Sequence, residues 1–233
     1  MLKYPIEIYY DGVDIKNNNS EIIKGFTTNI TLLKQGNITD YGKFIKDCLL
    51  YTNNRPISFQ LYDDEDIDIE KTARKIQSYD SSIYVKIPVI KTNGQLNNSI
   101  ISKLHKENIQ INVTAIFSKE EIESLKECFG IDTKVIISIF GGRINDYGLD
   151  CSDIVKYAVE TFKEYKNVKI LWAACRSVYN IVEANNQGAH IITVPETVLS
   201  KMHRLNQNVQ DGSLETVQLF RKDGINGNIK LDE

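Results

Sequence analysis

Short, β-branched apolar runs alternate with helical segments along almost all of the 233 residues. The alternation predicts strands near 6–11, 25–29, 56–62, 82–89, 109–114, 134–140, 168–174 and 189–194. Stretches with helical character separate most of them, at 40–51, 67–78, 96–107, 118–128, 150–165 and 177–187. Eight strands in this order indicate an α/β fold, the (β/α)8 barrel. An open doubly wound sheet is the alternative, although no glycine-rich phosphate fingerprint follows the first strand.

Each expected strand has one apolar face and one face that carries polar groups. In the run 82–89, Ile83, Val85 and Ile87 share one face, whereas Tyr84 and Lys86 lie on the other. Helices between the strands favour parallel pairing, and parallel sheets are covered on both faces. We therefore expect the polar faces to look into a shared interior.

Composition limits the classes of partner and compartment. The net charge is −3 and the sequence has no basic cluster, which argues against nucleic acid as a partner. No apolar run approaches the ~20 residues needed to span a bilayer. The N-terminus has no signal-peptide apolar region. The expectation is a cytoplasmic protein without membrane association, in which residues 1–233 form a single barrel domain.

Cysteines and histidines show no metal-binding pattern. The cysteines lack a C-x-x-C pair and are expected to be reduced thiols near buried faces; they are Cys48, Cys128, Cys151 and Cys175. The histidines stand alone and are interpreted as structural or surface residues; they are His105, His190 and His203. Neither a metal nor a cofactor is expected.

Lys86 is the unusual residue of its strand, because lysine is almost never buried unless it is paired or used. An edge strand with an exposed lysine is the alternative. Active sites of barrels lie at the C-terminal ends of the strands, where this lysine falls. Enclosure there disfavours the ammonium form, lowers the pKa and makes the neutral amine available as a nucleophile. Such an amine suits Schiff-base formation with a ketone or aldehyde.

Other strand ends add groups of complementary chemistry. Asp11 ends the first strand, where a carboxylate can shuttle protons. Asn29 and Asn112 can orient substrate hydroxyls or the lysine itself. Arg143 and Arg176 follow neighbouring strands and can hold an anion such as a phosphate. The same ends also carry Thr27, Thr28, Gln60, Thr114, Ser138 and Phe140.

Five motifs occur in a characteristic order. They are Gly25-Phe26-Thr27-Thr28-Asn29, Val85-Lys86-Ile87-Pro88, Asn112-Val113-Thr114-Ala115-Ile116-Phe117-Ser118, Ser138-Ile139-Phe140-Gly141-Gly142-Arg143-Ile144-Asn145-Asp146 and Ile170-Leu171-Trp172-Ala173-Ala174-Cys175-Arg176. With them the chain resembles, over nearly its whole length, the transaldolases and fructose-6-phosphate aldolases. These are class I aldolases on a (β/α)8 barrel.

The resemblance implies a catalytic group around the lysine. Lys86 would form the Schiff base with a ketose, and Asp11 would be the acid/base that contacts a substrate hydroxyl. Thr114 would hold the catalytic water, and Gln60 occupies a water-activating position. The implied reaction transfers or releases a dihydroxyacetone unit, in carbohydrate metabolism of the pentose phosphate type.

The resemblance also implies a site for a sugar phosphate, with Arg143 and Arg176 on the phosphate. The expected substrate-binding residues are Thr28, Asn29, Asn112, Ser138, Phe140, Arg143 and Arg176.

Four residues depart from the family pattern. Ile30 replaces the proline of TTNP, and Ala174 replaces a serine two residues before the second arginine. Many transaldolases have a glutamate where this chain has Gln60, and an amide cannot take that proton. The smaller aldolases pair that glutamine with a tyrosine, whereas this chain has Phe140. Transaldolase activity, simple aldol cleavage and a catalytically impaired sugar-phosphate-binding barrel therefore all stay open.

The C-terminal segment predicts an additional helix near 213–223. Its apolar residues, Leu214, Val217, Leu219 and Phe220, would form a sizeable patch in water. In small members of the resembling family such a helix packs across subunits of ring-like decamers. We expect a homo-oligomer larger than a dimer, a pentamer or decamer included. A helix folded over its own barrel is the alternative.

Overall fold

The computed structural model describes residues 4–130 and 132–231. Its strands form a closed parallel barrel in which each strand pairs with its neighbours in the sequence and β8 pairs with β1. The strands are β1 (Glu7–Asp11), β2 (Ile23–Thr27), β3 (Ile57–Gln60), β4 (Tyr84–Pro88), β5 (Ile111–Ile116), β6 (Val135–Ile139), β7 (Val168–Trp172) and β8 (Ile191–Pro195). The predicted (β/α)8 barrel is confirmed, and the open sheet is excluded.

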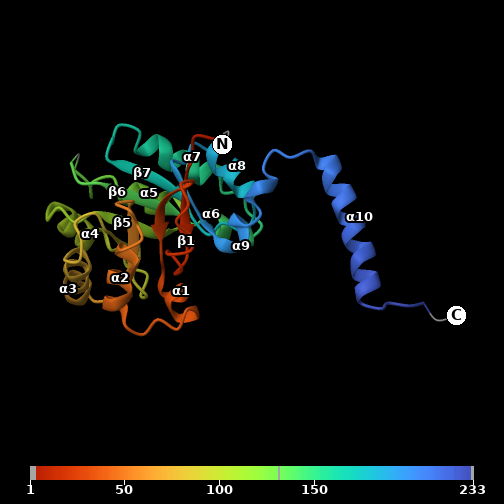
Figure 1. Cartoon of the computed structure of the whole chain (residues 1–233). Coiled ribbons are helices and arrows are strands. Elements are labelled where there is room, and N and C mark those ends of the chain that lie inside the picture. Colours follow the sequence, from red (N-terminus) through yellow and green to blue (C-terminus); the bar gives the residue numbers. More distant parts are fainter. Residues whose placement is uncertain (1–3, 131, 232–233) are drawn as a thin grey trace. The chain divides into compact units, whose positions relative to one another are not determined.

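Helices follow the strands from β2 onward, whereas β1 leads directly to β2 in the described residues (Figure 1). Those expected from the sequence are present as α2 (Tyr41–Leu49), α3 (Asp66–Gln77), α4 (Asn98–Lys106), α5 (Lys119–Ser124), α7 (Ser152–Thr161) and α8 (Tyr179–Asn186). Three short helices were not expected; they are α1 (Ile30–Gln35), α6 (Gly141–Asp146) and α9 (Glu196–Leu199). Because α1 and α6 begin directly after strands at the C-terminal end of the barrel, they help to build its mouth.

Local sequence explains several helix starts. Ser118 and Glu121 form a capping box at α5, with the Ser118 hydroxyl accepting from the Glu121 amide. Asn29 caps α1 by accepting from the Leu32 amide at 3.0 Å. In α3, Asp66 and Asp68 lie in the first turn, where negative charge is favoured.

Aromatic and aliphatic side chains close the floor of the barrel. Tyr9, Tyr84 and Leu171 pack together with Ile136, Ala173 and Ile191 in one buried cluster. Gly25 makes room for a ring here, because a Cβ at this position would lie 2.5 Å from carbons of Tyr9. The apolar floor separates the polar strand ends from the opposite end of the barrel.

Strand register sets the neighbours of the central lysine. Lys86 on β4 lies opposite Gln60 on β3 and Asn112 on β5. Asp11, the last residue of β1, lies opposite Thr27 on β2. Parallel pairing therefore brings residues from distant parts of the sequence to the same end of the barrel.

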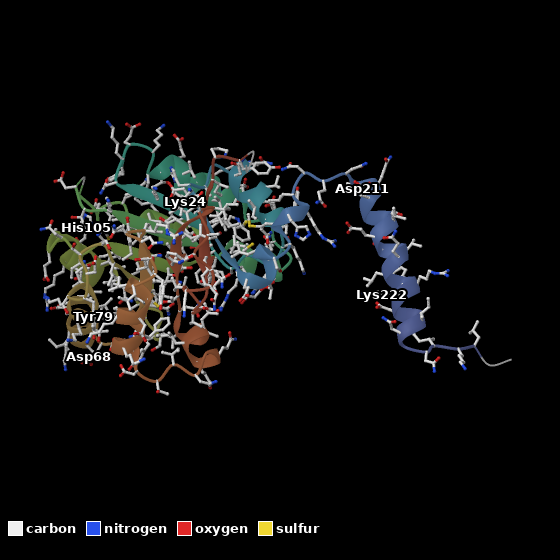
Figure 2. All side chains as sticks on the ribbon, viewed as in Figure 1. Lys24, Asp68, Tyr79, His105, Asp211 and Lys222 are labelled. Carbon is white, nitrogen blue, oxygen red and sulfur yellow. The ribbon has the colours of Figure 1, made fainter. Side chains whose placement is uncertain are left out.

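The chain divides into two compact units, Met1–Leu199 and Ser200–Glu233. The second unit contains η1 (Met202–Arg204) and α10 (Val209–Asn226), which extends the predicted terminal helix at both ends. The side chains of α10 are exposed, including its charged Asp211 and Lys222 (Figure 2). Its apolar residues are exposed too, Leu214 and Phe220 among them. Homo-oligomerisation through this helix stays a prediction.

In the described ranges, the cysteines and the histidines His105 and His190 have structural surroundings. All four cysteines are buried and free, as predicted. His105 is buried beside Phe129, and its Nε2 accepts from the Gly130 amide at 2.8 Å. His190 Nδ1 accepts from the Ile170 amide at 2.9 Å. Across residues 4–130 and 132–231, no helix is long and apolar enough to span a membrane.

Candidate active site

A cavity of about 400 Å³ opens at the C-terminal ends of the strands. It brings together eight of the residues singled out from the sequence, namely Asp11, Asn29, Gln60, Lys86, Thr114, Phe140, Arg143 and Arg176. Thr31, Leu32, Gln35, Ala115, Cys175 and Thr193 also line it. The polar strand faces thus look into a shared interior, as the alternation predicted.

Lys86 is enclosed at the base of this cavity, with only 5% of the residue exposed. Its Nζ donates to the Thr28 carbonyl oxygen at 3.3 Å. Burial lowers the pKa of Lys86; Asp11 opposes this change, and Arg143 reinforces it. The lysine therefore keeps a neutral amine at a lower pH than an exposed lysine does.

Asp11 shows the opposite change. Burial raises its pKa, while Lys86 and a hydrogen bond from Thr27 oppose the rise. Within the described residues no ion pair joins Asp11 directly to Lys86, although each influences the other. The pKa of the Asp11 carboxyl is thus raised and that of the Lys86 amine is lowered, so the two values lie closer together than for exposed groups.

Two threonine hydroxyls support Asp11 from the flanking strands. Thr27 Oγ1 on β2 donates to Asp11 Oδ1 at 2.7 Å. Thr193 Oγ1 on β8 is in hydrogen-bond contact with Thr27 Oγ1. Both threonines are buried. The sequence pattern alone assigned Thr193 no role in the site.

Thr28, Asn112 and Ser138 are buried and do not line the cavity. Asn112 donates from Nδ2 to Ser58 Oγ at 3.0 Å, and its Oδ1 accepts from Ser138 Oγ at 2.7 Å. Thr28 Oγ1 donates to the Ser58 carbonyl oxygen at 3.1 Å. These side chains therefore form a hydrogen-bonded layer around the lysine strand, with their polar groups already engaged.

Gln60 and Asn29 reach the cavity from β3 and from the start of α1. The Gln60 carbonyl oxygen accepts from Tyr41 on α2 at 2.9 Å, which ties the strand end to that helix. The Asn29 Oδ1 atom is occupied by its capping bond to Leu32. Asn29 thus keeps its amide NH2 for interactions in the cavity.

Thr114 presents a buried hydroxyl to the cavity. Within the described part of the chain its Oγ1 has no hydrogen-bond partner, although the residue is only 1% exposed. The next residue, Ala115, has a φ of 61°, in the left-handed region, and the pairing of β5 with β6 shifts register between Val113 and Ile116. The end of β5 is therefore irregular at the point where Thr114 lines the cavity.

Phe140 and Arg143 approach from the β6–α6 junction. The Arg143 guanidinium carbon lies 5.4 Å from the centre of the Phe140 ring, a cation–π contact. The ring also packs against Phe117 at 5.7 Å between centroids. Phe140 thus contributes an apolar wall and steadies a cation at the cavity edge.

Arg176 lies beside α6 in the loop between β7 and α8. Its Nη2 donates to Asp146 Oδ2 at 2.9 Å, and both side chains are about half exposed. Asn180 holds this loop by accepting from the backbone amides of Arg176 and Ser177, each at 2.9 Å. The two arginines of the site are therefore carried by neighbouring, interlocked segments.

Gly142 fixes the contact between these segments. Its amide donates to the Ala173 carbonyl oxygen at 3.2 Å, and a Cβ there would overlap the Ala174 carbonyl oxygen. Ala174 itself has a φ of 63°, a conformation that L-residues seldom adopt. A close backbone approach thus brings α6, with Arg143, against the loop that carries Arg176.

Cys175 is a second candidate nucleophile in the cavity. It is buried, and burial raises the pKa of its thiol to about 12. The thiolate, not the thiol, is the reactive form. Cys175 is therefore inert near neutral pH, and Lys86 is the stronger candidate.

Comparison with known proteins gives the family. The model of the family described as Transaldolase/Fructose-6-phosphate aldolase matches residues 8–232. The chain belongs to this family. It is accordingly an enzyme of the transaldolase or closely related aldolase type.

Curated relatives agree with this placement. A "Probable transaldolase" of Clostridium kluyveri is 33% identical over 190 residues, which cover 80% of this chain and 83% of the relative. Another, from Dehalococcoides mccartyi, is 30% identical over 182 residues, which cover 78% of this chain and 81% of the relative. A third, from Thermoanaerobacter sp., is 27% identical over 212 residues, which cover 90% of this chain and 91% of the relative.

Proposed function

We propose that this family member cleaves a ketose, in its phosphorylated form, through a Schiff base on Lys86. The observation that carries the proposal is the enclosed lysine with a lowered pKa, 5% exposed at the base of the cavity. Schiff-base chemistry requires a neutral amine, and enclosure supplies it.

The proposed reaction has two stages, formation of the Schiff base and cleavage of a carbon–carbon bond. The Lys86 amine adds to the ketone carbon, and loss of water from the adduct leaves an iminium ion. Asp11, as carboxylate, takes the proton of the hydroxyl two carbons away. The bond between this hydroxyl-bearing carbon and the carbon next to the iminium then breaks. An aldehyde departs, and the bonding electrons neutralise the iminium as an enamine.

Thr114 and Gln60 are proposed to handle water in this cycle. The Thr114 hydroxyl is buried and has no partner among the described residues, and it therefore suits a water that enters and leaves the adduct. Gln60 lies on the strand next to Lys86 and can donate or accept a hydrogen bond, but it cannot take a proton. Hydrolysis of the Schiff base must then rely on Asp11 for proton transfer.

Arg143 and Arg176 are proposed to bind the anionic end of the substrate. Both residues line the cavity, and guanidinium geometry matches phosphate oxygens. Asp146 engages one NH2 group of Arg176 and leaves the other donors for a ligand. Thr28, Asn29, Asn112 and Ser138 are proposed to shape the sugar-binding wall, Asn29 directly and the others from the buried layer behind it.

The fate of the enamine decides between transfer and release. Phe140 supplies no phenol, which favours transfer to an acceptor aldehyde over protonation by a tyrosine–glutamine pair. Gln60 favours the simple aldolase. Product analysis with a ketose phosphate, in the presence and absence of an acceptor aldehyde, distinguishes these activities. Cytoplasmic location and homo-oligomerisation stay predictions beside this proposal.

Borohydride trapping tests the proposed intermediate. Reduction in the presence of a ketose phosphate should fix a sugar-derived mass on the peptide that contains Lys86, because reduction converts the iminium into a stable secondary amine. Mass spectrometry of the digested protein locates the adduct. A lack of adducts across a panel of ketose phosphates, or an adduct on another lysine, contradicts the proposal.

The pH dependence should follow the lowered pKa of Lys86. Since the free amine is the reactive form, kcat/KM should rise with pH through the pKa of Lys86 and level off above it. The plateau should begin below the ~10.4 of an ordinary lysine, because burial favours the neutral form. Initial rates between pH 6 and 10 give the profile, and a flat line with chemistry rate-limiting would argue against a titrating nucleophile.

A further inference from the structure

Asp11 on β1 is connected through two hydroxyls to the strands that flank it, β2 and β8. Thr27 Oγ1 donates to Asp11 Oδ1 at 2.7 Å, and Thr193 Oγ1 contacts Thr27 Oγ1. Thr27 is 1% exposed and Thr193 is 3% exposed, so neither can exchange this contact for bulk water. Thr193 itself lines the cavity.

A count of hydrogens shows why two hydroxyls matter. Each hydroxyl has one hydrogen to donate and two lone pairs that accept. While Asp11 is a carboxylate, Thr27 gives its hydrogen to Asp11, and Thr193 donates to Thr27. Once Asp11 is protonated and donates to Thr27, the Thr27 hydrogen must turn to Thr193, whose own hydrogen then faces the cavity.

We propose that Thr27 and Thr193 form a reversible hydroxyl relay that serves both protonation states of Asp11. The proposal rests on the proposed function in one respect, that Asp11 exchanges protons during turnover. Neither threonine needs to move, because only the hydroxyl hydrogens rotate. Both act as positioning residues for Asp11, and Thr193 presents the end of the relay to water or substrate in the cavity.

The other charged and titratable groups near Asp11 come from separate elements. Lys86 on β4 favours the carboxylate form of Asp11, whose charge in turn acts on Tyr10 and Cys175. Arg143 on α6 acts on Lys86. None of these groups donates a hydrogen bond to Asp11 in the described structure, whereas Thr27 does. Changes in the two threonines therefore isolate the relay from the surrounding charges.

Removal of the two hydroxyls should have effects of opposite sign. In Thr193→Val the carboxylate form keeps its bond from Thr27, but a protonated Asp11 that donates to Thr27 leaves the Thr27 hydrogen buried without Thr193 as its acceptor. The pKa of Asp11 should therefore fall. In Thr27→Val the Asp11 carboxylate loses the hydrogen bond that Thr27 donates to it. This bond is charge-assisted and stabilises the carboxylate form, so the pKa of Asp11 should rise. Each titration midpoint should move by on the order of one pH unit.

Carbon NMR of protein labelled at the aspartate carboxyl groups measures the titration midpoint of Asp11 in each variant without requiring turnover. The Asp11 signal is assigned by its loss in Asp11→Asn. Thr193→Ser retains a hydroxyl and should titrate as the wild type does. Thr52→Val removes a buried hydroxyl that donates to the Leu49 carbonyl oxygen instead, and should leave the Asp11 midpoint unchanged.

Opposite shifts in Thr193→Val and Thr27→Val, with Thr193→Ser unchanged, support the relay. An unchanged or raised midpoint in Thr193→Val overturns it, and so does a wild-type Asp11 signal that does not titrate between pH 3 and 10. Denaturation curves of each variant identify a failure to fold. In that case Thr193→Ala should lower the pKa of Asp11 and Thr27→Ala should raise it, as expected for the valine variants. Loss of the Lys86 adduct would refute the proposed function without altering these midpoints.

Discussion

Replacement of Lys86 by methionine is expected to eliminate the borohydride-trapped adduct and to lower turnover by on the order of 10⁴-fold or more, because the reaction loses its only covalent route. Methionine is unbranched and apolar, so it suits a position that is 5% exposed and needs no partner for an ammonium group. The fold should therefore persist. Steady-state rates and mass spectrometry of the trapped protein measure the effect.

Lys169→Met is the matched control. Lys169 also lies on a barrel strand, β7, but its Nζ pairs with Glu7 Oε1 at 2.6 Å and it does not line the cavity. This variant should keep both the adduct and the turnover rate. Residual turnover of Lys86→Met within tenfold of the wild type would show that the lysine is not the nucleophile.

Asp11→Asn should lower turnover by ~10²–10⁴-fold, since an amide of the same shape cannot accept the substrate proton. The adduct on Lys86 should still form, because the amine and its enclosed surroundings are retained. The Thr27 hydroxyl can donate to the side-chain amide oxygen of this variant as it does to the Asp11 carboxylate, so the local geometry should survive. Single-turnover measurements separate adduct formation from carbon–carbon cleavage.

A nearby exposed carboxylate provides the control for Asp11→Asn. Asp14→Asn changes a residue whose carboxylate binds the Asn17 side chain outside the cavity, and it should leave both steps unaffected. If Asp11→Asn loses adduct formation and cleavage in equal measure, Asp11 supports formation of the Schiff base instead of acting at the cleavage step.

Strand order and the central lysine were predictable because they follow from periodicity. Alternation of apolar and polar residues places Lys86 on the inward face, and helices between strands leave parallel pairing as the consistent choice. The short helices α1 and α6 were missed, since each has six residues and no room for an apolar period. In α6, the initial Gly141 and Gly142 also oppose a helical interpretation.

Side-chain partnerships were the part that the sequence did not determine. Asn112, Ser138 and Thr28 occupy the expected strand ends, but their hydrogen bonds with one another and with Ser58 place them in a buried layer and not on the cavity surface. Thr193 acquires its link to Asp11 only because β8 closes the barrel against β1. Such contacts depend on strand register and rotamers, which periodicity does not specify.

The terminal helix illustrates a boundary error with a simple cause. The apolar pattern predicted residues 213–223, whereas α10 runs from Val209 to Asn226. Gly212 and Gly224 flank the predicted segment and disfavour helix, yet both lie within α10. Asn208 caps the start by accepting from the Gln210 amide at 3.1 Å, an interaction that extends the helix upstream of the first glycine.

The absence of side chains at Gly141 and Gly142 has a consequence for redesign of substrate range. A Cβ at Gly141 would overlap the Trp172 ring, and one at Gly142 would overlap the Ala174 carbonyl oxygen. Mutant libraries at these two positions would therefore consist mostly of misfolded protein. The opposite rim is built by α1, where Thr31 and Gln35 are exposed and line the cavity. Diversity is better introduced there, where new side chains have space to meet a longer or differently branched sugar.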